Sequence, residues 1–143
     1  MVTHSERTGG CACGAIRFRV TGPFIAVGVC HCKDCQKAAG GGPNYVALTP
    51  GPAFEVTKGQ AKLYRSRGAS GAEVGRAFCA DCGTPLWSLP AHEPFVPVKL
   101  GALDDSSDLT PNMHLYVSSA APWHLMHEGL PRFPQMPPGP PPG

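Results

Sequence analysis

The sequence is poor in charged side chains and in long apolar runs, and these shortages exclude several classes of protein. Charged residues make up 15% of the chain and the formal net charge is +2, which is too mild for a nucleic-acid-binding surface. No stretch approaches the roughly 18 apolar residues that a membrane-spanning helix needs. Residues 1–7 lack the apolar segment of a secretory signal. We therefore expect a cytoplasmic protein with neither nucleic-acid nor membrane partners.

Glycine and proline are frequent instead, with 18 and 17 copies, and they separate short apolar segments. In residues 15–20 the apolar side chains alternate with Arg17 and Arg19, as in a half-buried strand. Similar segments predict further strands at 24–29, 44–48, 53–57, 62–66, 75–78, 85–89, 95–100 and 113–118. One short helix is expected at 32–39. The predicted fold is mainly β, a sandwich or a folded sheet.

We divide the chain into three parts. A single domain at residues 9–133 is long enough to bury its own core, since 42% of the chain is hydrophobic. Residues 1–8 precede this domain as a short N-terminal extension. Residues 134–143 are rich in proline and glycine, a composition that does not build a packed core, so we expect a disordered tail.

The seven cysteines carry the strongest functional signal in the sequence. They fall into three clusters, which are Cys11 with Cys13, Cys30 with Cys32 and Cys35, and Cys79 with Cys82. Thiolates one or two residues apart can bind the same metal ion, because a short turn of backbone curls around it. A disulfide framework would require an oxidising compartment and usually an even number of cysteines. The spacing therefore predicts metal sites, and seven ligands divide into four and three.

The group of four is predicted to be a closed structural zinc site. Cys11 and Cys13 follow the N-terminal segment, and Cys79 and Cys82 lie between two late strands, so one ion would join distant parts of the chain. Four thiolates leave zinc no open position, and such sites contribute to folding. A glycine follows each pair, where the turn needs a residue without a Cβ.

The group of three, Cys30, Cys32 and Cys35, is predicted to be an open zinc site, which makes two zinc ions per chain. Three protein ligands leave one position for water or a substrate thiol. A thiolate-rich zinc is a poor Lewis acid but holds a bound thiol as the reactive thiolate. His31 could complete the site as a fourth ligand, although a residue between two ligands normally points away. Lys33 and Lys37 lie nearby and could meet a carboxylate.

The motifs around these cysteines resemble the glutathione-dependent formaldehyde-activating enzyme (Gfa, centromere protein V-like) family. The resemblance rests on CACG at 11–14, CHCKDCQK at 30–37 and FCADCGTPL at 78–86, followed by GALDD at 101–105 and GLPRF at 129–133. It covers residues 9–133. The resemblance implies an Mss4-like fold of folded antiparallel sheets with zinc-binding knuckles, and the same division of the cysteines. It also implies a carbon–sulfur lyase that forms S-hydroxymethylglutathione from glutathione and formaldehyde.

The leading hypothesis is an enzyme that adds a thiol, glutathione or a similar one, to formaldehyde or another small aldehyde, with Cys30, Cys32 and Cys35 as the catalytic residues. Its partners are then a small thiol and an aldehyde. His31 or a water could supply the final proton, with His114 a weaker candidate because a strand histidine more often has a structural hydrogen bond. Two alternatives stay open. One is a zinc-ribbon-like binding module without catalysis; the other is a redox sensor in which Cys32 and Cys35 form a disulfide and release zinc.

Overall fold

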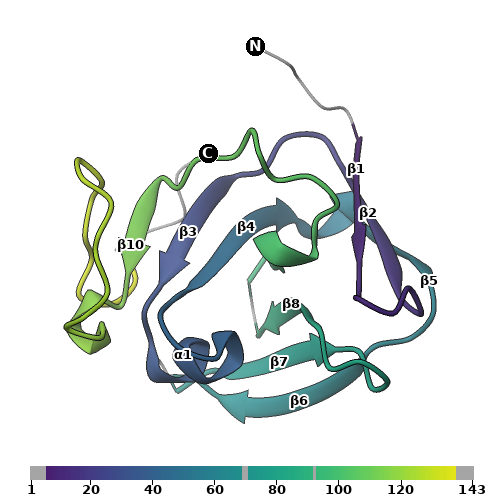
Figure 1. Cartoon of the computed structure of the whole chain (residues 1–143), viewed down its shortest axis with the longest axis horizontal. Coiled ribbons are helices and arrows are strands. Elements are labelled where there is room, and N and C mark those ends of the chain that lie inside the picture. Colours follow the sequence, from purple (N-terminus) through teal and green to yellow (C-terminus); the bar gives the residue numbers. More distant parts are fainter. Residues whose placement is uncertain (1–5, 69–70, 92, 138–143) are drawn as a thin grey trace.

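A computed structural model describes residues 6–68, 71–91 and 93–137 of the chain (Figure 1). Residues 1–5 and 138–143 lie outside the described residues, so most of the expected N-terminal extension and of the expected tail has no structural account. Within the described ranges, no helix is long and apolar enough to cross a membrane.

The described part of the chain forms two β-sheets (Figure 1). The smaller sheet has the order β1-β2-β5, and the larger one the order β10-β3-β4-β9-β8-β7-β6. The paired strands are antiparallel except for β10 and β3, which run parallel. The strands are β1 (Glu6–Gly10), β2 (Arg17–Thr21), β3 (Ala26–Cys30), β4 (Asn44–Pro50), β5 (Phe54–Lys58), β6 (Lys62–Arg67), β7 (Glu73–Phe78), β8 (Pro85–Pro90), β9 (Phe95–Lys99) and β10 (Met113–Leu115).

The described residues form one α-helix, α1 (Lys33–Ala39), which begins shortly after β3, and short 3₁₀ turns follow β4, β9 and β10. The mainly β fold with folded antiparallel sheets is therefore confirmed, and every strand expected from the sequence is present with small shifts at its ends. β10 is shorter than expected because Tyr116 takes a left-handed conformation with φ 55°, which ends the strand and turns the chain into a 3₁₀ helix over Val117–Ser119.

β1 was not expected from the sequence. Its five residues include Glu6, Arg7 and two glycines, and glycine and charge lower the tendency to form a strand. The strand forms because all five residues pair with β2, from Glu6 opposite Thr21 to Gly10 opposite Arg17. The first described residues of the expected extension thus belong to the smaller sheet.

The main core packs between the two sheets. The rings of Phe18 from β2, Phe54 from β5 and Trp87 from β8 contact one another in tilted and edge-to-face arrangements, with centroids 4.9–6.1 Å apart, and Phe18 is fully buried. A second buried cluster lies around Val46, Leu48 and Leu115 in the larger sheet. Burying large aromatic side chains removes much apolar surface from water and contributes strongly to the stability of the core.

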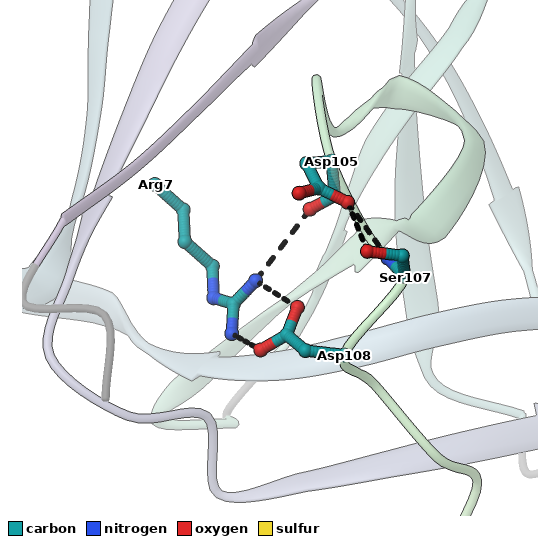
Figure 2. A network of polar contacts seen from close by, with 4 residues as sticks. All are labelled: Arg7, Asp105, Ser107 and Asp108. Atoms are coloured by element: carbon teal, nitrogen blue, oxygen red, sulfur yellow. Dashed lines mark hydrogen bonds and ion pairs between the residues drawn. The ribbon is translucent and has the colours of Figure 1, made fainter. Parts of the chain in front are cut away.

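A polar network attaches β1 to the segment that follows β9 (Figure 2). The Arg7 guanidinium donates two hydrogen bonds to the Asp108 carboxylate and lies over the ring of Phe24. Asp105 accepts hydrogen bonds from the backbone and the hydroxyl of Ser107, which holds the turn. These contacts hold β1, which leads into Cys11, against the segment that follows β9.

Asp104, in the same segment, supplies a test of this attachment. Its carboxylate accepts hydrogen bonds from Arg17 and Thr8, and the Arg17 bond lowers the Asp104 pKa to about 2 from 3.8. Because the pKa of Asp104 is lower in the folded state than in the unfolded state, its ionised carboxylate stabilises the folded protein above about pH 4. This stabilisation is lost as the pH falls towards 2.

We expect Asp104→Asn to destabilise the protein by less than about 1 kcal/mol at pH 7, because the carboxylate is half exposed and screened by water. Thermal unfolding of both proteins at the same series of pH values measures the difference. It should shrink as the pH approaches 2; a constant difference across that range would contradict the role of the Asp104 charge.

Candidate metal centres

The four cysteines predicted to form a closed site come together between the two sheets. The sulfurs of Cys11, Cys13, Cys79 and Cys82 all lie within 4.8 Å of one another. Cys11 and Cys13 follow β1 of the smaller sheet, whereas Cys79 and Cys82 lie in the turn from β7 to β8 of the larger sheet. A metal ion on these four sulfurs would join the two sheets directly.

Each cysteine pair sits on a tight turn of the same design. In one turn the Gly14 N–H donates to the carbonyl of Cys11, and in the other the Gly83 N–H donates to the carbonyl of Cys79. Both glycines have positive φ, 81° and 79°, which a residue with a Cβ adopts only at a cost. The turns also direct the N–H groups of Ile16 and Cys82 at the sulfurs of Cys11 and Cys79. N–H donors around sulfur stabilise thiolates, so both turns suit a thiolate metal site.

Thr84 links the two turns, and the sequence analysis did not single it out. Its hydroxyl oxygen lies 3.0 Å from the Ala12 N–H, which donates to it, and 3.1 Å from the sulfur of Cys82. This contact crosses from the first turn to the second. Its position directly after the Cys79–Gly83 turn, within the motif at 78–86, is the one sequence feature that could have pointed to this role.

Without a cation the four thiols cannot all ionise. The Thr84 hydroxyl and backbone N–H groups lower the pKa of Cys82 to about 5. Although the Ala15 N–H opposes the change, hydrogen bonding to Cys11 raises the pKa of Cys13 to about 12. One thiol is thus driven to ionise while its neighbour keeps its proton, and a divalent cation would remove this conflict. The donor set fits zinc, which prefers sulfur ligands.

The other three cysteines gather where β3 passes into α1. The sulfurs of Cys30, Cys32 and Cys35 also lie within 4.8 Å of one another. Cys30 ends β3, where Asn44 of β4 and Leu115 of β10 flank it. Cys32 is the N-cap of α1, and its sulfur accepts the Cys35 N–H at 3.3 Å. The start of the helix therefore holds two of the three sulfurs close together.

The three thiols share one negative charge. Hydrogen bonds from Cys30 and then Cys32 lower the pKa of Cys35 to about 2, and Asn44 and Lys99 act in the same direction. Hydrogen bonding to Cys32 and Cys35 raises the pKa of Cys30 well above its ordinary value. All three can become thiolates only with a compensating cation, so this group also fits a zinc ion held by three protein sulfurs.

A cavity of about 190 Å³ opens in front of Cys30, Cys32 and Cys35. Among its lining residues are Tyr116, Arg76 and Lys99, none of which the sequence analysis identified. Lys99 is buried at the end of β9 with 8% of its surface exposed, and this burial lowers its pKa. Burial also raises the pKa of Tyr116, so the phenol keeps its proton at neutral pH.

Both histidines considered as proton donors are buried in a pair. His31 Nε2 and His114 Nδ1 are 2.9 Å apart, and the backbone N–H of His127 donates to His114 Nε2. His114 Nε2 is therefore an acceptor, so Nδ1 carries the proton and donates to His31. Burial lowers the pKa of both rings. Neither residue lines the cavity, and His114 has the structural hydrogen bonds that its place in a strand suggested.

The chain is similar to known proteins over most of its length. The family model described as "Glutathione-dependent formaldehyde-activating enzyme" matches residues 6–119. A protein of Halomonas elongata, whose name provisionally makes it a glutathione-dependent formaldehyde-activating enzyme, is 31% identical over 121 residues, which are 80% of this chain and 77% of that protein. A crystal structure of a Rhodobacter sphaeroides protein has the same fold, with a TM-score of 0.56 at 21% identity over 71% of this chain and 91% of that one.

Proposed function

Because the chain belongs to the glutathione-dependent formaldehyde-activating enzyme family, we propose that it adds a thiol, glutathione or a similar one, to formaldehyde or another small aldehyde. The observation that carries this proposal is the cavity at Cys30, Cys32 and Cys35. The group of three sulfurs lines a cavity that a substrate can enter, whereas the group of four connects a turn of the smaller sheet to a turn of the larger sheet. The first group is therefore assigned to catalysis and the second to folding.

The three sulfurs would hold a zinc ion, and a bound zinc ion would keep the substrate thiol as a thiolate, the form that attacks a carbonyl carbon. The new bond joins the sulfur and the aldehyde carbon, and the carbonyl oxygen then takes a proton to give the hemithioacetal. Lys99 lines the cavity, where its ammonium group would stabilise the negative charge that develops on the carbonyl oxygen.

Tyr116 is the side chain that we assign to the final proton transfer, in place of His31 and His114. It lines the cavity, and its pKa is raised first by burial and then by the negative charge on the three cysteines. Its left-handed backbone, with φ 55°, is a strained conformation of the kind found at functional sites. A water molecule in the cavity is the other possible source of this proton.

Exchange NMR on an equilibrated mixture of glutathione and formaldehyde tests the function. We expect the zinc-loaded protein to speed the interconversion with S-hydroxymethylglutathione above the spontaneous rate.

In the same measurement Tyr116→Phe tests the proton donor. If the Tyr116 hydroxyl donates the proton, the variant should lower the enzyme-catalysed part of the exchange rate by roughly tenfold or more. A fully zinc-loaded protein without any rate effect would support the binding module instead. Zinc release by mild peroxide, with a Cys32–Cys35 disulfide, would support the redox sensor.

A further inference from the structure

Two cationic side chains beside the three cysteines have no carboxylate partner among the described residues. Arg76 of β7 has a buried Nε without a hydrogen-bond partner, and Lys99 is buried at the end of β9. The ion pairs formed within residues 6–68, 71–91 and 93–137 include neither of them. The anionic groups that act on Lys99 are Cys30, Cys32 and Cys35, and a zinc ion on their sulfurs would offset that charge. A buried cation is costly without an anion, so this arrangement suits a ligand that brings one.

Arg76 and Lys99 belong to two cavities at once. Both line the 190 Å³ cavity in front of the three cysteines, and both line a second cavity of about 380 Å³ beside α1. Usual ligand sites occupy roughly 300–1,000 Å³, so the first cavity alone is small for a peptide-sized thiol. A ligand with its sulfur at the cysteines would extend past Arg76 and Lys99 into the second cavity.

The charges around the second cavity also favour an anion. Lys37, Arg76 and Lys99 line it together with a single carboxylate, that of Asp34. The first cavity does include Glu73 and Glu93, but both are exposed residues, and Glu73 pairs with Arg65. Lys33, which the sequence placed near the cysteines, is exposed and lines neither cavity.

We propose that Arg76 and Lys99 bind a carboxylate of the thiol substrate, which limits the substrate class to thiols that carry a carboxylate. This inference rests on the proposed function, because it assigns the sulfur of the same molecule to Cys30, Cys32 and Cys35. The guanidinium receives the carboxylate with paired N–H donors, and the Lys99 ammonium adds a second charge. Binding of the carboxylate by Arg76 and Lys99 thereby positions the sulfur of the same molecule at the three cysteines.

A binding experiment tests this site without relying on catalysis. Isothermal titration calorimetry measures the affinity of the zinc-loaded protein for S-methylglutathione, which has no free thiol, and for its dimethyl ester. We expect the ester to bind roughly 10-fold to 100-fold more weakly, since charge-assisted hydrogen bonds to the carboxylate are lost. Arg76→Gln and Lys99→Met should each bring the affinity for the acid close to that for the ester.

Lys33→Met is the matched control, because it removes a lysine next to Cys32 that lines neither cavity; it should leave the preference for the acid unchanged. Circular dichroism and zinc content verify that each variant is folded, and Arg76→Lys, which keeps a charge, should retain part of the preference. Equal binding of the acid and the ester by the wild-type protein overturns the proposal, as does a folded Arg76→Gln that keeps the full preference.

Exchange rates separate the failure of this inference from the failure of the proposed function. If the wild-type protein accelerates addition equally for glutathione and its diethyl ester, the carboxylate site is wrong and the function stands. If the acid binds in preference and Arg76→Gln removes that preference, but no thiol is accelerated, the carboxylate site stands and the proposed function is wrong.

Discussion

Replacing Cys79 by serine is expected to prevent the protein from folding. Cys79 is 1% exposed, and its sulfur is one of the four that converge between the two sheets. Structural zinc sites contribute roughly 10 kcal/mol or more of binding energy to folding, whereas a whole domain has a stability of about 5–15 kcal/mol. Losing this metal site would therefore remove most of the stability. Soluble yield, zinc content and thermal unfolding by circular dichroism measure the effect.

Ala80→Ser is the control for Cys79→Ser, since it introduces the same hydroxyl at an exposed position of the same turn; it should unfold at nearly the wild-type temperature. Stripping zinc from the wild-type protein with a strong chelator should reproduce the unfolding seen with Cys79→Ser. A soluble Cys79→Ser protein that melts within a few degrees of the wild type would contradict a structural role for the four cysteines.

Replacing Cys32 by serine is expected to abolish catalysis while the protein stays folded. Serine is a preferred N-cap residue, so its hydroxyl can accept the Cys35 N–H that the Cys32 sulfur accepts now, and α1 should persist. The third sulfur ligand is lost, so we expect the zinc content to fall from two ions per chain to one. The exchange rate of glutathione with formaldehyde should fall to the spontaneous value.

The contrast between the two serine variants distinguishes the two cysteine groups. Cys32→Ser should destabilise the protein much less than Cys79→Ser, because Cys30, Cys32 and Cys35 lie in one segment from β3 to α1 and do not join the two sheets. Zinc analysis and thermal unfolding on the same preparations provide both numbers. If Cys32→Ser kept two zinc ions and full activity, the assignment of Cys30, Cys32 and Cys35 to catalysis would be wrong.

Much of the fold was predictable because its signals are local. The alternation around Arg17 and Arg19 predicted β2, and the Gly/Pro turns separated the later strands at nearly their observed positions. β1 was missed because its residues have no strand signal of their own and form a strand only against β2. The end of β10 was missed because the left-handed turn at Tyr116 depends on packing against β3 and on the segment after it, where Gln135 accepts the Tyr116 N–H.

The candidate site also has parts with a local sequence signal and parts that depend on contacts between distant residues. The spacing along the chain was enough to predict three clusters of cysteines, because sulfurs separated by one or two residues stay close regardless of the rest of the fold. Joining Cys11 and Cys13 to Cys79 and Cys82 needed a long-range inference, and the structure brings these four sulfurs together. The residues that surround the cysteines follow from the pairing of distant strands and could not be read from local spacing. Lys99 reaches the site because β9 pairs with β4. Arg76 comes from β7, and Tyr116 follows the end of β10. The pairing of β10 with β3 also brings His31 and His114 within hydrogen-bond distance of each other. Register and packing between distant strands control these neighbours, and no local pattern encodes them.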